Sequence, residues 1–206
     1  MKITILFCIV ITLLGCSEER TQKADPDTIR IVCNKVLAVD TINEPTLYFI
    51  LEFKISGTSE VSLNNNYMFS DQFSDGGLFI EDSILYPGKV HVGSVLRSNN
   101  FVVKPNKILK LLFVFNNQVG DSISKAMFSL ACRDYQKRFG KEWVSHFIEH
   151  INLSYKYSDN QKNENEQSKS NHSEVINRET KVQIFQPKIF YFQRLTVEEE
   201  FSFMKD

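Results

Sequence analysis

Hydrophobic and polar residues alternate along much of the first half of the chain. The clearest stretch places hydrophobic side chains at five successive odd positions, Leu47, Phe49, Leu51, Phe53 and Ile55. A period of two directs these side chains to one face of an extended chain, whereas a helix would scatter them around its circumference. Residues 47–55 are therefore predicted to form a strand.

Clusters of turn-forming residues divide this half of the chain into short segments. Asparagine, glycine and proline gather at 64–66, 75–77 and 87–88. The apolar run at 108–115, interrupted only by Lys110, predicts a central strand that is covered on both faces. About seven or eight short strands at this spacing are typical of an antiparallel sandwich. We expect a mainly β, sandwich-like domain over residues 28–157.

The hydrophobic period changes from that of a strand to that of a helix after Gly120. Hydrophobic side chains then follow one helical stripe: Phe128, Ala131, Cys132, Tyr135 and Phe139. Asp121 or Ser122 is expected to cap this helix and Gly140 to end it. A shorter stripe over 143–151 predicts a second helix, so the fold class is α+β, with one or two helices inserted after the central strands.

The last fifty residues fall into two parts of opposite character. Residues 158–181 are almost entirely polar, and such a composition predicts a disordered linker. Residues 182–206 are rich in aromatic side chains that need to be covered. Two alternatives stay open for this segment: a last strand that docks on the domain, or a strand that pairs with the sheet edge of a partner.

The N-terminus carries a short apolar run that follows the single cation Lys2. Twelve helical residues, from Ile3 to Leu14, span about 18 Å, less than the roughly 30 Å of a hydrocarbon core, so the run indicates a signal peptide. Leu13-Leu14-Gly15-Cys16 resembles the lipobox of bacterial lipoproteins. The resemblance implies that residues 1–15 are removed and that Cys16 becomes the acylated, palmitate-bearing first residue.

The lipoprotein resemblance also implies a location in the cell envelope. Residues 16–27 would form a flexible tether between the lipidated cysteine and the domain. The acidic Ser17-Glu18-Glu19 is similar to the surface-export signal of lipoproteins in Bacteroidetes. We therefore expect a protein anchored to a membrane, with the outer membrane favoured, on its periplasmic or its surface side.

Charge and cysteine content bear on two further questions, nucleic-acid binding and disulfide formation. The net charge of −1 becomes −2 once Lys2 is removed, so no basic excess points to nucleic acid. Because Cys8 leaves with the signal and Cys16 is lipidated, Cys33 and Cys132 are left as one candidate disulfide. The alternative is that both are separate buried thiols.

His146-Phe147-Ile148-Glu149-His150 resembles the H-x-x-E-H zinc motif of the inverzincin proteases. The resemblance implies zinc ligands at His146 and His150, with Glu149 activating water. This chain departs from the pattern because no long helical stretch follows that would carry the family's third ligand. The alternative is the polar flank of a short amphipathic helix.

Two further kinds of site are suggested by short patterns. Asp71 and Asp75 offer oxygen ligands to calcium, although an Asp-Gly hairpin turn explains the same residues. Four Asp-Ser or Asp-Thr pairs precede isoleucine and resemble the O-glycosylation motif of exported Bacteroidetes proteins. The motif would place sugars on Thr28, Thr41, Ser83 and Ser122. Turns and helix caps use the same pairs.

Together these patterns predict a lipid-anchored envelope protein that is a non-catalytic binding or structural module without a cofactor. One alternative is a small hydrolase or zinc enzyme that uses His146, Glu149 and His150. Another is a subunit of an envelope complex that meets its protein partner through residues 182–204.

Overall fold

The alternating segments of the sequence fold into the strands of one curved sheet. The structure is a computed structural model and describes residues 29–58, 60–64, 76–80, 84–91, 100–159 and 176–205. The elements are β1 (Ile29–Val39), β2 (Thr46–Ile55), β3 (Val61–Asn64), β4 (Gly76–Ile80), β5 (Ile84–Val90), β6 (Asn100–Val103), β7 (Leu109–Phe115), α2 (Ser122–Phe139), the 3₁₀ helix η1 (Gly140–Glu142), α3 (Trp143–Glu149), β8 (Ile151–Asp159), β9 (Ile176–Phe192) and α4 (Val197–Met204).

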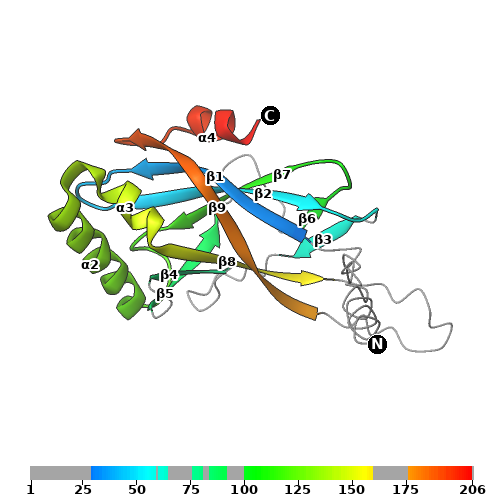
Figure 1. The fold of residues 1–206 in the computed structure, drawn as a ribbon, viewed down its shortest axis with the longest axis horizontal. Coiled ribbons are helices and arrows are strands. Elements are labelled where there is room, and N and C mark those ends of the chain that lie inside the picture. Colours follow the sequence, from blue (N-terminus) through cyan, green and yellow to red (C-terminus); the bar gives the residue numbers. More distant parts are fainter. Residues whose placement is uncertain are drawn as a thin grey trace, which may run out of the picture.

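Seven of these strands close into a barrel. The pairing runs in the order β4-β5-β7-β2-β1-β9-β8, and β8 returns to β4 through the register pair Leu78 and Leu153. The short strands β3 and β6 extend the sheet from the far end of β8. All strand pairs are antiparallel except β1 with β9, which run parallel (Figure 1).

The mainly β character is confirmed, but the predicted antiparallel sandwich is wrong. The aromatic segment near the C-terminus inserts as β9 between β1 and β8, in the middle of the sheet (Figure 1). This insertion makes one pair parallel and joins the two sides of the sheet, so the sheet closes on itself. The strands flanking the predicted linker also extend into it, since β8 ends at Asp159 and β9 begins at Ile176.

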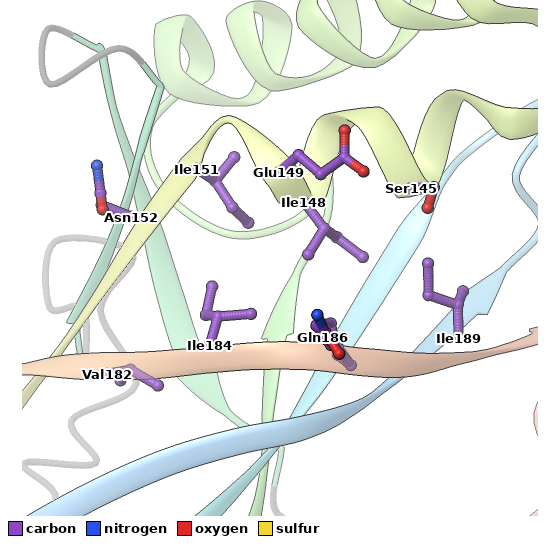
Figure 2. A pocket seen from close by; sticks show the side chains of 10 residues that line it. Ser145, Ile148, Glu149, Ile151, Asn152, Val182, Ile184, Gln186 and Ile189 are labelled. Atoms are coloured by element: carbon purple, nitrogen blue, oxygen red, sulfur yellow. The ribbon is translucent and has the colours of Figure 1, made fainter.

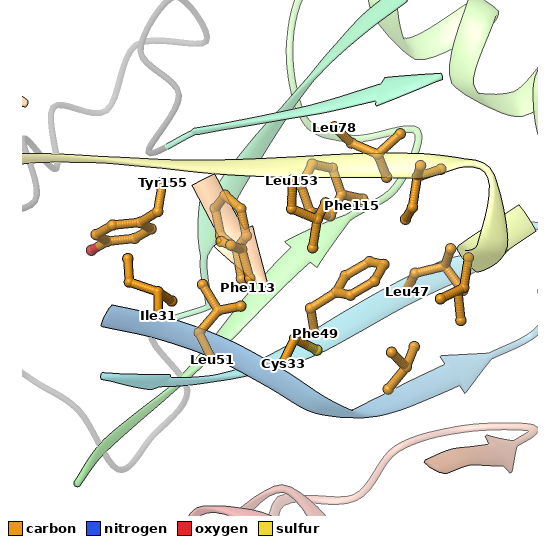
Figure 3. Close-up of a cluster of buried hydrophobic side chains, with 14 of the residues drawn as sticks. Ile31, Cys33, Leu47, Phe49, Leu51, Leu78, Phe113, Phe115, Leu153 and Tyr155 are labelled. Atoms are coloured by element: carbon orange, nitrogen blue, oxygen red, sulfur yellow. The ribbon is translucent and has the colours of Figure 1, made fainter. Parts of the chain in front are cut away.

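Aromatic side chains fill the barrel interior. Phe49, Phe113, Phe115 and Tyr155 are fully buried there (Figure 3). Together with the fully buried Phe53 they meet edge to face, with ring centroids 4.9–5.8 Å apart. Such pairs are favoured by the quadrupoles of the rings, in addition to the apolar area that they bury.

Two glycines make room for these rings at the wall formed by β4 and β5. Gly76 and Gly88 lie directly opposite each other in the register of the two strands. A Cβ atom on Gly88 would lie 2.5 Å from the Phe115 ring, and one on Gly76 would lie 2.9 Å from the Phe113 ring. The absent side chains therefore allow the rings to lie against the backbone.

Helices α2 and α3 close one end of the barrel (Figure 1). The predicted first helix is confirmed: the Asp121 side chain accepts a hydrogen bond of 2.8 Å from the Ser124 amide, and Gly140 ends α2 with φ of 57°. The two helices bury a common apolar face, which consists of Phe128, Cys132, Tyr135, Trp143, Val144 and Phe147.

Helix α4 covers part of the outer barrel wall. Leu37, Ile50 and Leu112 point outward from β1, β2 and β7 and are buried beneath Phe203 and its neighbours. Thr196 and Glu199 form a capping box at the start of α4, and Glu200 lies 3.0 Å from the His91 ring. Among the described residues, no helix is both long enough and apolar enough to cross a membrane.

Candidate functional site

Strand β9 changes its neighbours along its length. From Ile176 to Val182 it pairs with β8, and from Gln183 to Phe192 it pairs with β1. Strand β8 begins only at Ile151, where the chain leaves α3. The first half of β9 therefore has β8 along one edge. Along the same edge, the second half of β9 has helix α3 instead of a strand.

A pair of bulges marks the place where β9 leaves β8. Between Cys33 and Lys35, strand β1 has one residue more than its neighbour β2. Over the same interval of β1, strand β9 runs from Ile184 to Lys188 and so has two residues more than β1. Gln186 takes up the additional length with a left-handed φ of 33°. Bulges of this kind turn a strand and redirect its side chains.

A hollow of about 520 Å³ lies between α3 and the second half of β9, and we call it the α3–β9 hollow. Ile148 and Ile151 face Ile184 and Ile189 across it (Figure 2). Its polar lining consists of Ser145, Glu149, Asn152 and Gln186. The lining therefore combines apolar and polar groups, and binding sites use polar groups of this kind to orient a ligand.

A second hollow of about 620 Å³ follows at the N-terminal end of α3, and we call it the Trp143 hollow. Tyr191 of β9 and Ile42 of the β1–β2 turn line it together with Trp143. Burial, and then the nearby Glu142 carboxylate, raise the pKa of the Tyr191 hydroxyl above its ordinary value. Ile42 is 81% exposed, so the hollow has an apolar side chain at its mouth.

The residues of the predicted zinc motif are engaged with one another and with α2. His146 stacks on Phe139 with ring centroids 4.2 Å apart, and its Nδ1 lies 3.3 Å from Glu149 Oε2. His150 Nδ1 lies 2.7 Å from the His146 carbonyl oxygen, beyond the last residue of α3. Within the described ranges, no group of three or more histidine, cysteine, aspartate or glutamate side chains could hold a metal. The structure thus supplies no third ligand for the zinc interpretation.

The two cysteines of the described chain are free thiols, so the candidate disulfide is not formed in the structure. Cys33 lies in β1 beside the bulge and donates a hydrogen bond of 3.3 Å to the Lys35 carbonyl, whereas Cys132 lies in α2. Each side chain is buried in the hydrophobic core.

Two of the four predicted glycosylation sites can be located in the structure. Ser122 is the exposed first residue of α2, directly after its cap Asp121. Thr41 is half-buried in the β1–β2 turn, where its carbonyl accepts a hydrogen bond from Gln136. The aspartate before each has a cap or turn role, since Asp40 accepts from the Asn43 amide, and glycosylation stays a prediction.

Several predicted residues lie outside the described residues. They are the lipidation site Cys16, the calcium candidates Asp71 and Asp75, and the glycosylation candidates Thr28 and Ser83.

Sequence reasoning missed both hollows, because neither has a local motif. The one available signal is Gln186-Pro187, a break inside an otherwise apolar and aromatic segment. Comparisons of the chain with protein-family models, with curated proteins and with solved structures give no match.

Proposed function

We propose that the protein is a lipid-anchored envelope protein that acts as a non-catalytic binding module through the α3–β9 hollow. The observation that carries this proposal is a hollow, lined by both apolar and polar groups, beside a strand whose neighbour has ended.

The position of the hollow suits a tethered protein. Residues 16–28 reach about 43–47 Å when extended, at roughly 3.3–3.6 Å per residue. Strand β1 starts at the end of the barrel opposite α2 and α3 (Figure 1). The tether from a lipidated Cys16 would therefore join the domain at one end of the barrel. The α3–β9 hollow, at the other end, would stay accessible to a partner.

The anchor is tested by substituting the lipidation site in the full chain. We expect Cys16→Ala to abolish incorporation of labelled palmitate and to move the protein from the detergent phase to the aqueous phase. Cys8→Ala is the matched control, because that cysteine lies within the signal and should leave both readouts unchanged. Palmitate incorporation that persists in Cys16→Ala would contradict the anchor.

The binding role is tested by a photo-crosslinking residue placed in the hollow of the full chain in its native host. Ser145 lines the α3–β9 hollow, while Arg133 is exposed on the outer side of α2 and serves as the control position. We expect a discrete adduct from position 145 and none of the same size from position 133. The absence of an adduct at 145, or the same adduct at both positions, would count against the hollow as a binding site.

A further inference from the structure

Among the residues that the structure describes, the second half of β9 has a strand neighbour on one edge only. The Phe192 carbonyl accepts a hydrogen bond of 3.0 Å from the Asp40 amide, so the backbone groups of Phe192 point toward β1. Because these directions alternate along a regular strand, Phe190 and Lys188 also direct theirs toward β1. The N–H and C=O groups of Ile189 and Tyr191 then point away from β1, to what we call the free edge.

The described residues offer no strand to the free edge. Pairing of β9 with β8 ends at Val182, and the chain that precedes β8 is α3. A helix satisfies its own backbone groups, so α3 faces the edge with side chains. An edge of this kind is a template for another extended chain.

The side chains along the free edge have the spacing of a strand. Ile189 lines the α3–β9 hollow, and Tyr191, two residues further on, lines the Trp143 hollow. Two residues in a strand span about 6.6–6.8 Å, and the alternate side chains of a bound strand repeat at the same interval. The two hollows therefore match positions i and i+2 of an extended peptide.

We propose that the free edge of β9 binds an extended peptide of a partner protein, which adds as a strand beside Ile189 and Tyr191 and places alternate apolar side chains in the two hollows. The proposal rests on the proposed function and names its ligand class. It continues an interface that the fold already has, because the added strand would follow the line along which β8 pairs with β9.

The backbone groups favour a peptide over an apolar small molecule. A lipid chain in the hollows would bury the edge groups of Ile189 and Tyr191 without hydrogen bonds, and unpaired buried groups are costly. A peptide backbone supplies the missing donors and acceptors. The bulge at Gln186 and Pro187 interrupts the edge on one side, which limits the bound segment to a few residues.

The test selects peptides on the full chain in detergent from a random nine-residue library displayed on phage. We expect enriched peptides with apolar residues at i and i+2, and we would measure synthetic copies by fluorescence anisotropy. N-methylation at a residue whose N–H pairs with the edge should weaken binding about five- to tenfold, while the adjacent position should tolerate it. Equal effects at every position, or no enriched peptide, would overturn the proposal.

Two variants at one position distinguish the contribution of the protein backbone to peptide binding from the contribution of the side chain. Tyr191→Pro removes the edge-facing N–H, and Tyr191→Ala removes only the side chain. We expect binding of the selected peptide to be weaker in the proline variant by about five- to tenfold. If the proline variant does not fold, the N-methyl series decides the question alone. Equal affinities of the two folded variants, or a concentration-dependent dimer that occupies the edge, would contradict the proposal.

The outcomes distinguish this inference from the proposed function. A site-specific adduct at position 145 without any peptide selection would leave the binding module intact and overturn the strand addition. Peptide binding to the edge, with no adduct at position 145 in the host, would support the strand addition and count against the α3–β9 hollow as the site that is used in the host.

Discussion

At the scale of single residues, the two buried thiols show how the core controls chemistry. Burial raises the pKa of Cys33 and of Cys132 from an ordinary value of 9.0 to about 12. The thiolate is the reactive form of cysteine, so both side chains should be inert while the protein is folded.

We predict that iodoacetamide at pH 8 labels Cys33 and Cys132 only after unfolding in urea. Mass spectrometry of the labelled peptides, without a reductant, measures this directly. Labelling of the folded protein at the rate of the unfolded one would contradict the burial. Failure of the unfolded protein to label would show instead that the two cysteines are bonded to each other.

The same pKa shifts make stability depend on pH. Between about pH 9 and pH 12 the unfolded chain releases thiol protons that the folded chain retains, so the free energy of unfolding falls as pH rises. At pH 10 the loss is about 1.4 kcal/mol per thiol. Urea unfolding under reducing conditions should show a smaller decline from pH 8 to pH 10 in the double variant Cys33→Ala, Cys132→Ala. Equal declines in both proteins would contradict the prediction.

At the scale of elements, helix α4 protects an outer patch of the barrel wall. The Phe203 ring packs against Phe190 and Phe192 of β9, with centroids 5.0 and 6.0 Å apart. Beneath it lie Leu37 and Ile50, which are fully buried although they point away from the barrel interior. Helix α4 therefore packs on the barrel through the face that carries Phe203.

We predict that Phe203→Ala lowers the free energy of unfolding by about 1–2 kcal/mol, because it exposes part of this patch. Phe201→Ala is the matched control on the same helix. Its side chain is 37% exposed and has the Lys205 ammonium above its ring, and its loss should cost less than the loss of Phe203. Urea unfolding measures both variants, and equal losses would show that α4 is not docked by this face.

At the scale of the whole molecule, closure of the barrel depends on β9. This strand pairs with β1 on one side and with β8 on the other. It therefore connects the first strand of the barrel to the strand that pairs with β4. Without it the sheet would have two long apolar edges and an exposed aromatic core.

We predict that a chain ending at residue 159 has no cooperative thermal transition, whereas a chain ending at residue 192 retains one with a lower Tm. The first deletion removes β9 and α4, and the second removes only α4. Circular dichroism on heating compares the two with the full chain. A chain ending at 159 that melts like the full chain would show that β9 is not part of the core.

Local features of the fold could be predicted where neighbouring residues carry the signal. Alternation over 47–55 identifies β2, and the stripe from Phe128 to Phe139 identifies α2 with its Asp121 cap. The first residues of β9, in contrast, are polar enough to suggest a linker. They form a strand because β8 lies beside them, in register from Asp159 to Leu153.

The candidate site could not be predicted from the sequence, because the residues that form it are far apart along the chain. The α3–β9 hollow combines residues 145–152 with residues 182–189, and no spacing rule connects the two segments. The five-residue zinc pattern, which the sequence does display, has no third ligand within the described chain. A short motif records the order of residues but not what surrounds them.

The sequence by itself determined strand β2 and helix α2 with its Asp121 cap, because hydrophobic period and caps act between residues a few positions apart. It also carries the resemblance to a lipoprotein precursor at Leu13 to Cys16. Only the tertiary structure decided that β9 lies parallel to β1, that the sheet closes into a barrel, and that half of β9 has one edge without a strand neighbour among the described residues. These properties depend on pairings between residues far apart in the sequence, such as Val32 with Gln183 and Leu78 with Leu153, and the burial of the whole core selects among them.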